Sequence, residues 1–310
     1  MLSRWLRACL ALAVAGLVAI AAWLVRGEGW GPGAAAAAVL AGLLAATILK
    51  TVITYALARS VGMRTGSGRT RGARRPAWRG AAAEWASAWT MYLVIMPFER
   101  LWMRAEAVAP GATGRIPVLL VHGYLCNRGV WWWMRRRLCR DGFPVATIDL
   151  EPPFDDIDAF ADQLHARIEA LIAETGAERI ALVAHSMGGL VCRAYLRRYG
   201  AQRVERLITL ASPHHGTWMA RLGLGKNARQ MELESAWIRE LSAGEPLPVS
   251  AASIWSLDDE LIVPTESSHL HGAREKVLSG VGHLALVASR TVFDEVQTEL
   301  EAAQRLWRGQ

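Results

Sequence analysis

Residues 184–189 read Ala-His-Ser-Met-Gly-Gly, and the segments on either side show what this stretch does in the fold. Before it, Glu178–Val183 is a short, mostly apolar run that predicts a buried strand. After it, Leu190–Arg198 has helical spacing and contains no glycine or proline. A serine at a strand-to-helix junction, with small residues two positions before and after it, is the sequence form of a nucleophile elbow. The stretch therefore predicts that Ser186 is a nucleophile presented on a sharp turn.

Two kinds of partner must accompany such a serine. Its hydroxyl becomes a useful nucleophile when a base takes the proton and an acid orients that base. At an elbow the partners follow in the order acid, then histidine. Between Ser186 and residue 290 the aspartates are Asp258 and Asp259, just after a predicted strand. His283 follows on a glycine-rich loop after the last predicted strand, so we predict it as the base and one of the two aspartates as its acid.

A developing oxyanion needs two N–H donors. One is expected from Met187, which follows the serine and begins the next helix, where the positive end of the helix dipole lies. The other is expected from the loop after the first predicted strand, which reads Val-His-Gly-Tyr at residues 121–124. We assign it to the amide of Tyr124. His122 is expected to support this loop through a hydrogen bond.

Strands and helices alternate from residue 116 onward, which predicts an α/β fold with a mostly parallel, doubly wound sheet and helices on both faces. The globular domain is placed at residues 81–310, with a possible cap at 217–250 and an amphipathic helix at 81–107. Predicted strands lie at 116–121, 144–149, 178–183, 204–210, 252–256 and 276–279, and predicted helices at 130–139, 157–172, 190–198 and from 289.

The N-terminal region has a different composition. Residues 8–25 and 34–58 are apolar runs long enough to cross a bilayer, which takes roughly 20 helical residues. Lys50 lies inside the second run and would have to snorkel or face a partner. Residues 1–59 are therefore predicted as a membrane anchor of two helices, and the arginine- and glycine-rich residues 60–80 as a linker.

Charge is divided along the same boundary. Residues 1–80 contain 11 basic residues and one acidic residue, whereas the remainder contains 24 basic and 27 acidic residues. No basic surface is left for nucleic acid on the globular part, and the arginines suit anionic lipid. The arginines flanking the two spans predict that both termini and the globular domain are cytoplasmic. A signal peptide cleaved near Ala19–Ala21 and a single uncleaved anchor are the alternatives.

Four segments carry a resemblance to a known family: residues 121–124, 184–189, 256–259 and 280–284. With them, residues 115–300 resemble an α/β-hydrolase of the bacterial lipase and esterase type, whose elbow reads Ala-x-Ser-x-Gly. The similarity to membrane-bound inositol deacylases is looser. The resemblance implies Asp259 as the acid, because the family's Ser-x-x-Asp pattern falls on it. This chain departs from the family pattern by one extra residue between Asp259 and the following Ile-Val, so Asp258 remains an alternative acid. The resemblance does not extend to residues 1–80.

These observations predict a serine ester hydrolase (lipase or carboxylesterase) that cleaves acyl esters of lipids, with no metal or organic cofactor. The expected partners are a lipid or other acyl-ester substrate and a membrane, which we predict to be the bacterial inner membrane. No nucleic-acid partner is expected. An acyltransferase with the same triad and a non-catalytic membrane scaffold are the alternatives.

Overall fold

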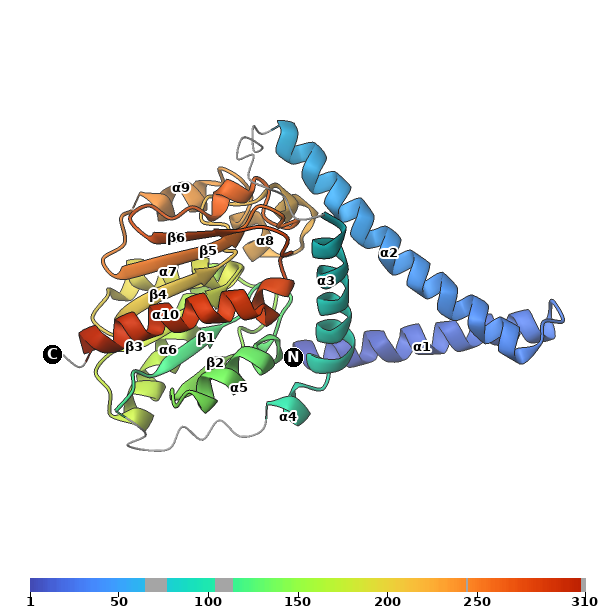
Figure 1. Ribbon diagram of the computed structural model, residues 1–310, viewed down its shortest axis with the longest axis horizontal. Coiled ribbons are helices and arrows are strands. Elements are labelled where there is room, and N and C mark those ends of the chain that lie inside the picture. The colour runs from blue at the N-terminus through green and yellow to red at the C-terminus, as the bar shows by residue number, and fades with distance from the viewer. Residues whose placement is uncertain (65–76, 104–113, 244, 308–310) are drawn as a thin grey trace.

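Residues 114–307 form a sheet between layers of helices (Figure 1). The computed structural model describes residues 1–64, 77–103, 114–243 and 245–307. All five strand pairings in the six-stranded sheet are parallel, as the alternating pattern predicts. The strands are β1 (Val118–Val121), β2 (Val145–Ile148), β3 (Ile180–His185), β4 (Val204–Leu210), β5 (Ser250–Ser256) and β6 (Arg274–Leu278), in the spatial order β2-β1-β3-β4-β5-β6.

Long helices cover both faces of the sheet. One face carries α6 (Ile157–Thr175) and α7 (Met187–Tyr199), and the other carries α5 (Trp132–Arg140) and α10 (Arg290–Trp307) (Figure 1). Successive residues of β1 divide between the two cores: Leu119 and Val121 pack with α6 and α7, whereas Val118 and Leu120 pack with α5 and α10. This two-sided burial explains why β1, β2 and β3 are mostly apolar runs instead of alternating patterns.

The strand order reverses beside β1, because β2 lies on one side of it and β3 on the other. In open α/β sheets, ligands bind outside the carboxyl ends of the strands at such a switch point. The loop after β1 begins at His122, and Ser186 follows β3 directly. The topology therefore brings these two segments to the edge where a substrate is expected.

Element boundaries differ from expectation where caps and short turns intervene. The helix expected at 130–139 begins as a 3₁₀ turn, Arg128–Trp131, whose N-cap is the side chain of Asn127. The segment 217–250 contains two short helices separated by Glu234, which has a φ of 56°. They are α8 (Lys226–Gln230) and α9 (Ala236–Ser242), and further 3₁₀ turns cover Trp218–Leu222, Thr265–Ser268 and Ala285–Ala288.

The N-terminal region is helical on both sides of a segment, residues 65–76, that lies outside the described residues. The predicted linker at 60–80 falls mostly on that segment, and both of its ends are helical instead, in α2 (Pro32–Arg64) and α3 (Ala77–Trp89). The helix expected at 81–107 is divided: α3 continues as a π-helical turn, Thr90–Ile95, and α4 (Glu99–Trp102) follows. Residues 104–107 are not described.

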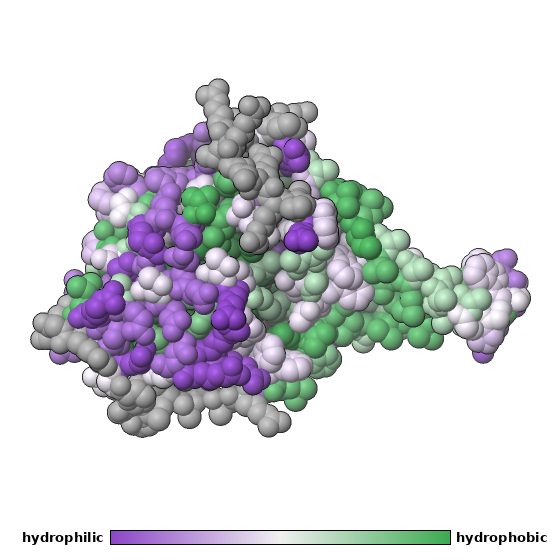
Figure 2. All heavy atoms as spheres, viewed as in Figure 1, coloured by the Kyte–Doolittle hydropathy of each residue, from purple (hydrophilic) through white to green (hydrophobic). Residues whose placement is uncertain are grey.

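The first two helices, α1 (Leu2–Arg26) and α2, form a V whose apex points away from the sheet (Figure 1). Both are long and apolar enough to cross a membrane, and the most apolar window of each has no buried residues. Apolar side chains cover this hairpin, whereas polar ones dominate the visible face of the rest (Figure 2). The open ends of the V reach the sheet domain: Leu2 is buried against it, and Ala58 and Val61 of α2 pack with Val263.

Candidate active site

Ser186 occupies a strained turn between β3 and α7. Its φ and ψ are 55° and −127°, a conformation in which a residue with a side chain is typically strained by about 1–3 kcal/mol. Its N–H donates to the carbonyl oxygen of Leu210 in β4 over 2.8 Å, which holds the turn to the sheet. The side chain is almost buried, at 8% exposure. This is the geometry of the predicted nucleophile elbow.

Two glycines allow the backbone to close around this serine. A Cβ on Gly188 would lie 2.5 Å from the carbonyl oxygen of Val121, so α7 could not begin so near the end of β1. A Cβ on Gly123 would lie 2.7 Å from Ser186 Cβ and 3.3 Å from its Oγ. The loop after β1 therefore passes directly over the serine, and only glycine fits at both contacts.

Asp259 and His283 are in direct contact. The Nδ1–H of His283 donates to Oδ2 of Asp259 over 2.8 Å, and both side chains are buried. Asp258 points elsewhere and accepts the N–H of Gly280 over 2.6 Å. The structure thus pairs the histidine with the aspartate that the family pattern indicates. With Nδ1 occupied, Nε2 is the ring nitrogen left to act as a base.

His185 joins the serine turn to the histidine loop. Its Nε2–H donates to the carbonyl oxygen of His283 over 3.1 Å, and the two ring centroids are 4.6 Å apart. Burial lowers the pKa of His185 well below its ordinary value, so it is neutral. Among the described residues, Ser186 Oγ has no hydrogen-bond partner, and such catalytic contacts often tighten only when substrate binds.

The pKa of His283 is raised. Burial by itself would lower it, but the charge and hydrogen bond of Asp259, and then the charge of Glu84, outweigh burial and favour the imidazolium. A base with a raised pKa holds the serine proton more strongly. The surroundings of His283 therefore favour its protonated form.

The oxyanion donors predicted from the sequence are the backbone amides of Met187 and Tyr124. The N–H of Met187 is the first of α7 and has no acceptor in its own helix. His122 determines the direction of the other amide: its Nδ1–H donates to the Gly123 carbonyl over 2.9 Å, and its Nε2 accepts the N–H of Leu150 over 3.0 Å. Because a trans peptide points its C=O and N–H in opposite directions, this contact directs the N–H of Tyr124 away from His122.

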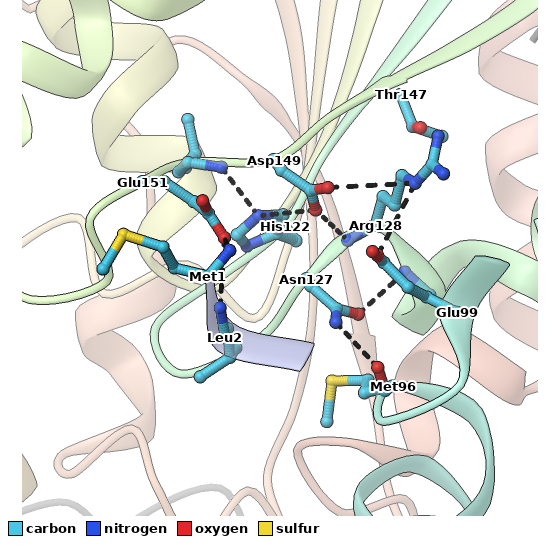
Figure 3. Close-up of polar contacts among 12 residues, drawn as sticks. Met1, Leu2, Met96, Glu99, His122, Asn127, Arg128, Thr147, Asp149 and Glu151 are labelled. Carbon is cyan, nitrogen blue, oxygen red and sulfur yellow. Dashed lines mark hydrogen bonds and ion pairs between the residues drawn. The ribbon is translucent and has the colours of Figure 1, made fainter. Parts of the chain in front are cut away.

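The loop that carries Tyr124 is tied to the N-terminal segment as well as to the sheet (Figure 3). Asn127 Nδ2 donates to the carbonyl oxygen of Met96 over 2.9 Å, and Arg128 lies 3.5 Å from the carboxylate of Glu99. Asp149, after β2, accepts the N–H of Arg128 over 2.7 Å. The segment that follows the membrane-length helices is therefore part of the support for this loop.

Comparison with known proteins identifies the fold. A family model described as "alpha/beta hydrolase fold" matches residues 116–225, which include β1, the elbow and Tyr124. The mature lipase BlEst2 of Bacillus licheniformis superposes with a TM-score of 0.55 at 18% identity, over 60% of this chain and 92% of that one. Lipase B of Aspergillus fumigatus gives 0.52 at 20% identity, over 57% of this chain and 50% of that one. This chain has the α/β-hydrolase fold.

Curated relatives of this α/β-hydrolase fold protein include a triacylglycerol lipase from Burkholderia plantarii, 29% identical over 46% of this chain and 43% of the lipase. Lysosomal thioesterase PPT2 from Rattus norvegicus is 31% identical over 43% of this chain and 44% of the thioesterase. The chain spans less than half the length of both relatives. They support a general similarity to lipases and thioesterases, whereas the likeness to inositol deacylases stays a prediction.

Two buried acids near His283 are not predicted by the sequence analysis. Glu84 of α3 and Glu260, directly after Asp259, both contact the loop that carries His283. Both are at most 5% exposed. In the sequence, Glu260 follows two aspartates that fit the role of triad acid better. Glu84 fits the polar face of the predicted amphipathic helix. An acid on an otherwise uncharged, tryptophan-rich stretch was the only signal for Glu84.

Proposed function

We propose that this protein is a serine hydrolase that cleaves acyl esters of lipids through a Ser186–His283–Asp259 triad. The observation that carries the proposal is the buried contact between Asp259 Oδ2 and His283 Nδ1, on a loop tied to the residue before Ser186. The strained elbow and the close approach of Gly123 add support. The lipase and thioesterase relatives point to the same reaction class, hydrolysis of an acyl bond.

The reaction follows from these positions. Ser186 Oγ attacks the ester carbonyl carbon while His283 Nε2 takes its proton, and the oxyanion receives the amides of Met187 and Tyr124. When the tetrahedral intermediate collapses, the bond to the alcohol oxygen breaks and His283 returns the proton to it. Water then attacks the acyl carbon while His283 takes a proton from it; as the bond to Ser186 breaks, His283 returns that proton to Ser186 Oγ and the carboxylic acid leaves. Asp259 stays ionised and stabilises the imidazolium in both halves.

Apolar surface beside the loop of Tyr124 supports a lipid as the acyl donor. Trp5 of α1 packs edge-on against Phe154 with centroids 6.3 Å apart, and Phe154 packs against Tyr124 at 6.2 Å. The hydroxyl of Tyr124 bonds to both backbone groups of Leu224. Leu224 and the nearby Leu222 are 69% and 61% exposed. An apolar substrate or a membrane would cover these side chains favourably.

The helical hairpin supports a membrane as the location. Helix α1 is about 37 Å long at 1.5 Å per residue, compared with roughly 30 Å of bilayer hydrocarbon. Its first residues and the end of α2 both contact the sheet domain. A hairpin that crosses twice would therefore leave the N-terminus and the catalytic domain on the same side of the membrane, as the proposed cytoplasmic placement requires.

Thioester hydrolysis is a second candidate, because lysosomal thioesterases are among the relatives. It would use the same acyl-enzyme with a thiol as the leaving group. Acyl transfer to an alcohol is a third possible outcome of the same intermediate, and a relative from Sus scrofa is named a 1-acylglycerol-3-phosphate O-acyltransferase, 31% identical over 31% of this chain. The three differ only in the leaving group or the acceptor.

A fluorophosphonate probe on the full chain in detergent tests the proposal. We expect labelling of the wild type, and of Ser235→Ala, which removes a helix-capping hydroxyl of α9, but none of Ser186→Ala. A series of p-nitrophenyl esters of increasing chain length, an acyl thioester and an added alcohol then separate the three reactions. A folded wild type that neither labels nor hydrolyses any of these substrates would contradict catalysis and favour a scaffold.

A further inference from the structure

The loop that carries His283, residues 279–285, is surrounded by carboxyl groups. Asp259 binds the imidazole, and Asp258 accepts the N–H of Gly280. Glu260 Oε2 accepts the N–H of His283 itself over 3.2 Å. Glu84 takes the next two amides: its Oε1 accepts from Leu284 over 3.0 Å and its Oε2 from Ala285 over 2.8 Å. The backbone on both sides of the histidine is thus held by acids.

Glu84 differs from the other three acids because it comes from outside the α/β-hydrolase fold. It belongs to α3, and 200 residues separate it from Leu284. Helix α3 packs tightly on the loop: a Cβ on Gly80 would lie 3.3 Å from the backbone of Gly280. A Cβ on Gly282 would lie 2.7 Å from Glu84 Oε2 and 2.6 Å from the hydroxyl of Tyr55 in α2. The loop has no space to shift toward these helices.

A buried carboxylate is costly unless its charge is satisfied. Among the described residues, no lysine or arginine pairs with Glu84, and its partners are the two amides and the field of His283. Each amide bond to a charged acceptor is stronger than one between neutral groups. A residue of this kind serves to position what it contacts.

We propose that Glu84 is a positioning residue of the active site, which fixes the backbone of residues 283–285 so that the imidazole stays on Asp259 with its Nε2 free to serve Ser186. This rests on the proposed function, in which His283 is the base. It makes α3, and with it the segment that follows the membrane-length helices, a required part of the catalytic centre and not only a connection to it.

Electrostatics give the proposal a readout that a purely structural contact lacks. Four ionisable side chains face His283, and they are Asp259, Glu84, Glu260 and His185. Tyr55 of α2 is close to the three acids. Burial raises the pKa of Glu84, and the amides and His283 oppose this rise. Burial, then Glu84 and Asp259, raise the pKa of Glu260 well above its ordinary value, so Glu260 holds a proton more readily. Glu84, with two amide donors, is the better placed of the two acids to keep its charge.

The test is Glu84→Gln in the full chain, with Glu99→Gln as the matched control. Glu99 is also a buried acid of the N-terminal segment, but it contacts Arg128 and not the His283 loop. A glutamine at 84 keeps the shape, loses the charge and turns an NH₂ toward one of the two amides. We expect kcat to fall about tenfold or more with little change in KM. The acid limb of the kcat/KM profile, where His283 gains its proton, should move to lower pH.

The sign follows from the charge that is removed. An anionic Glu84 favours the imidazolium and raises the pKa of His283, so its loss lowers that pKa and preserves activity to lower pH. Glu99→Gln should leave the midpoint unchanged even if it lowers thermal stability. An unchanged kcat and midpoint in a folded Glu84→Gln protein would overturn the proposal.

Two further measurements keep the result decisive. If Glu84→Gln does not fold, Gly80→Ala retains the charge but presses α3 against Gly280; kcat should fall without a shift of the midpoint, and an unaltered kcat overturns positioning. If the wild type has no hydrolase activity, the proposed function fails, and NMR titration of ¹⁵N-labelled histidines still tests Glu84. A pKa of His283 that is equal in wild type and Glu84→Gln would then overturn it.

Discussion

Asp258 and Asp259 are neighbouring carboxylates with different partners, and this difference gives a sharp test at the scale of single residues. Asp259→Asn replaces the acceptor of the His283 Nδ1–H with an amide that can present its NH₂ and select the wrong tautomer. We expect kcat to fall on the order of 10³- to 10⁴-fold. Asp258→Asn removes one acceptor from the N–H of Gly280 and should cost far less. Steady-state hydrolysis of one ester by both variants measures the difference.

Equal losses in the two variants, or a larger loss at Asp258, would show that His283 uses the other acid during turnover. The same pair of variants reports on the electrostatics. Asp259 is the main group that raises the pKa of His283, so Asp259→Asn should also lower the midpoint of the residual pH profile. Asp258→Asn should leave that midpoint near the wild-type value.

Residue types in order along the chain were enough to predict Ser186, His283 and the two candidate acids, because the elbow imposes small neighbours and the fold imposes the order. The choice between Asp258 and Asp259 needed the coordinates, since a single residue of spacing decides which side chain faces the imidazole. The contact of Glu84 with the His283 loop could not be predicted. Its partners are backbone amides 200 residues away, and every residue except proline has such an amide, so no sequence pattern indicates them.

At the scale of elements, the junction of β3 and α7 depends on how closely the helix approaches the neighbouring strand. Gly188→Ala would place a methyl group 2.5 Å from the carbonyl oxygen of Val121 and 2.8 Å from that of His122. Because both contacts are backbone atoms, the start of α7 must move, at an expected cost of about 1–3 kcal/mol of unfolding free energy. Activity should fall too, because the amide of Met187 moves with the helix.

Gly42→Ala is the matched control for this prediction. It is the same substitution within a helix, but among the described residues no atom outside its own stretch of helix lies within 4 Å of the added Cβ. Thermal unfolding of the full chain in detergent, followed by circular dichroism, compares the two variants. A Gly188→Ala protein as stable and as active as Gly42→Ala would contradict the close packing of α7 against the end of β1.

Elements with long apolar periodicity were predictable, and their ends were less so. Helix α6 was predicted from its apolar stripe and ends near the expected position, where Gly176 adopts a left-handed conformation. The segment 217–250 was harder, because its short helices depend on contacts with distant loops, such as that of Lys226 N–H with the carbonyl oxygen of Phe154. Helix α3 showed the right amphipathic character, but only the packing revealed which face meets the His283 loop.

At the scale of the whole molecule, the V-shaped hairpin joins two helices of membrane-spanning length to the sheet domain. The N-terminus contacts Glu151 after β2, and the last turns of α2 contact Val263, so both open ends of the V meet the carboxyl edge of the sheet. The apex at residues 27–31 lies farthest from the sheet (Figure 1). If both helices cross a bilayer, the apex and the catalytic domain must lie on opposite sides of it.

Paired reporter fusions test this arrangement. A reporter active only in the cytoplasm should be active when fused after residue 310, and one active only in the periplasm should be active when inserted after Gly29, because the arginines near both open ends of the V favour the cytoplasm. Both fusions should stay with the membrane after alkaline extraction. Periplasmic activity at the C-terminus would reverse the predicted sidedness, and a soluble, shortened product lacking α1 would replace the two-helix anchor with a cleaved signal peptide.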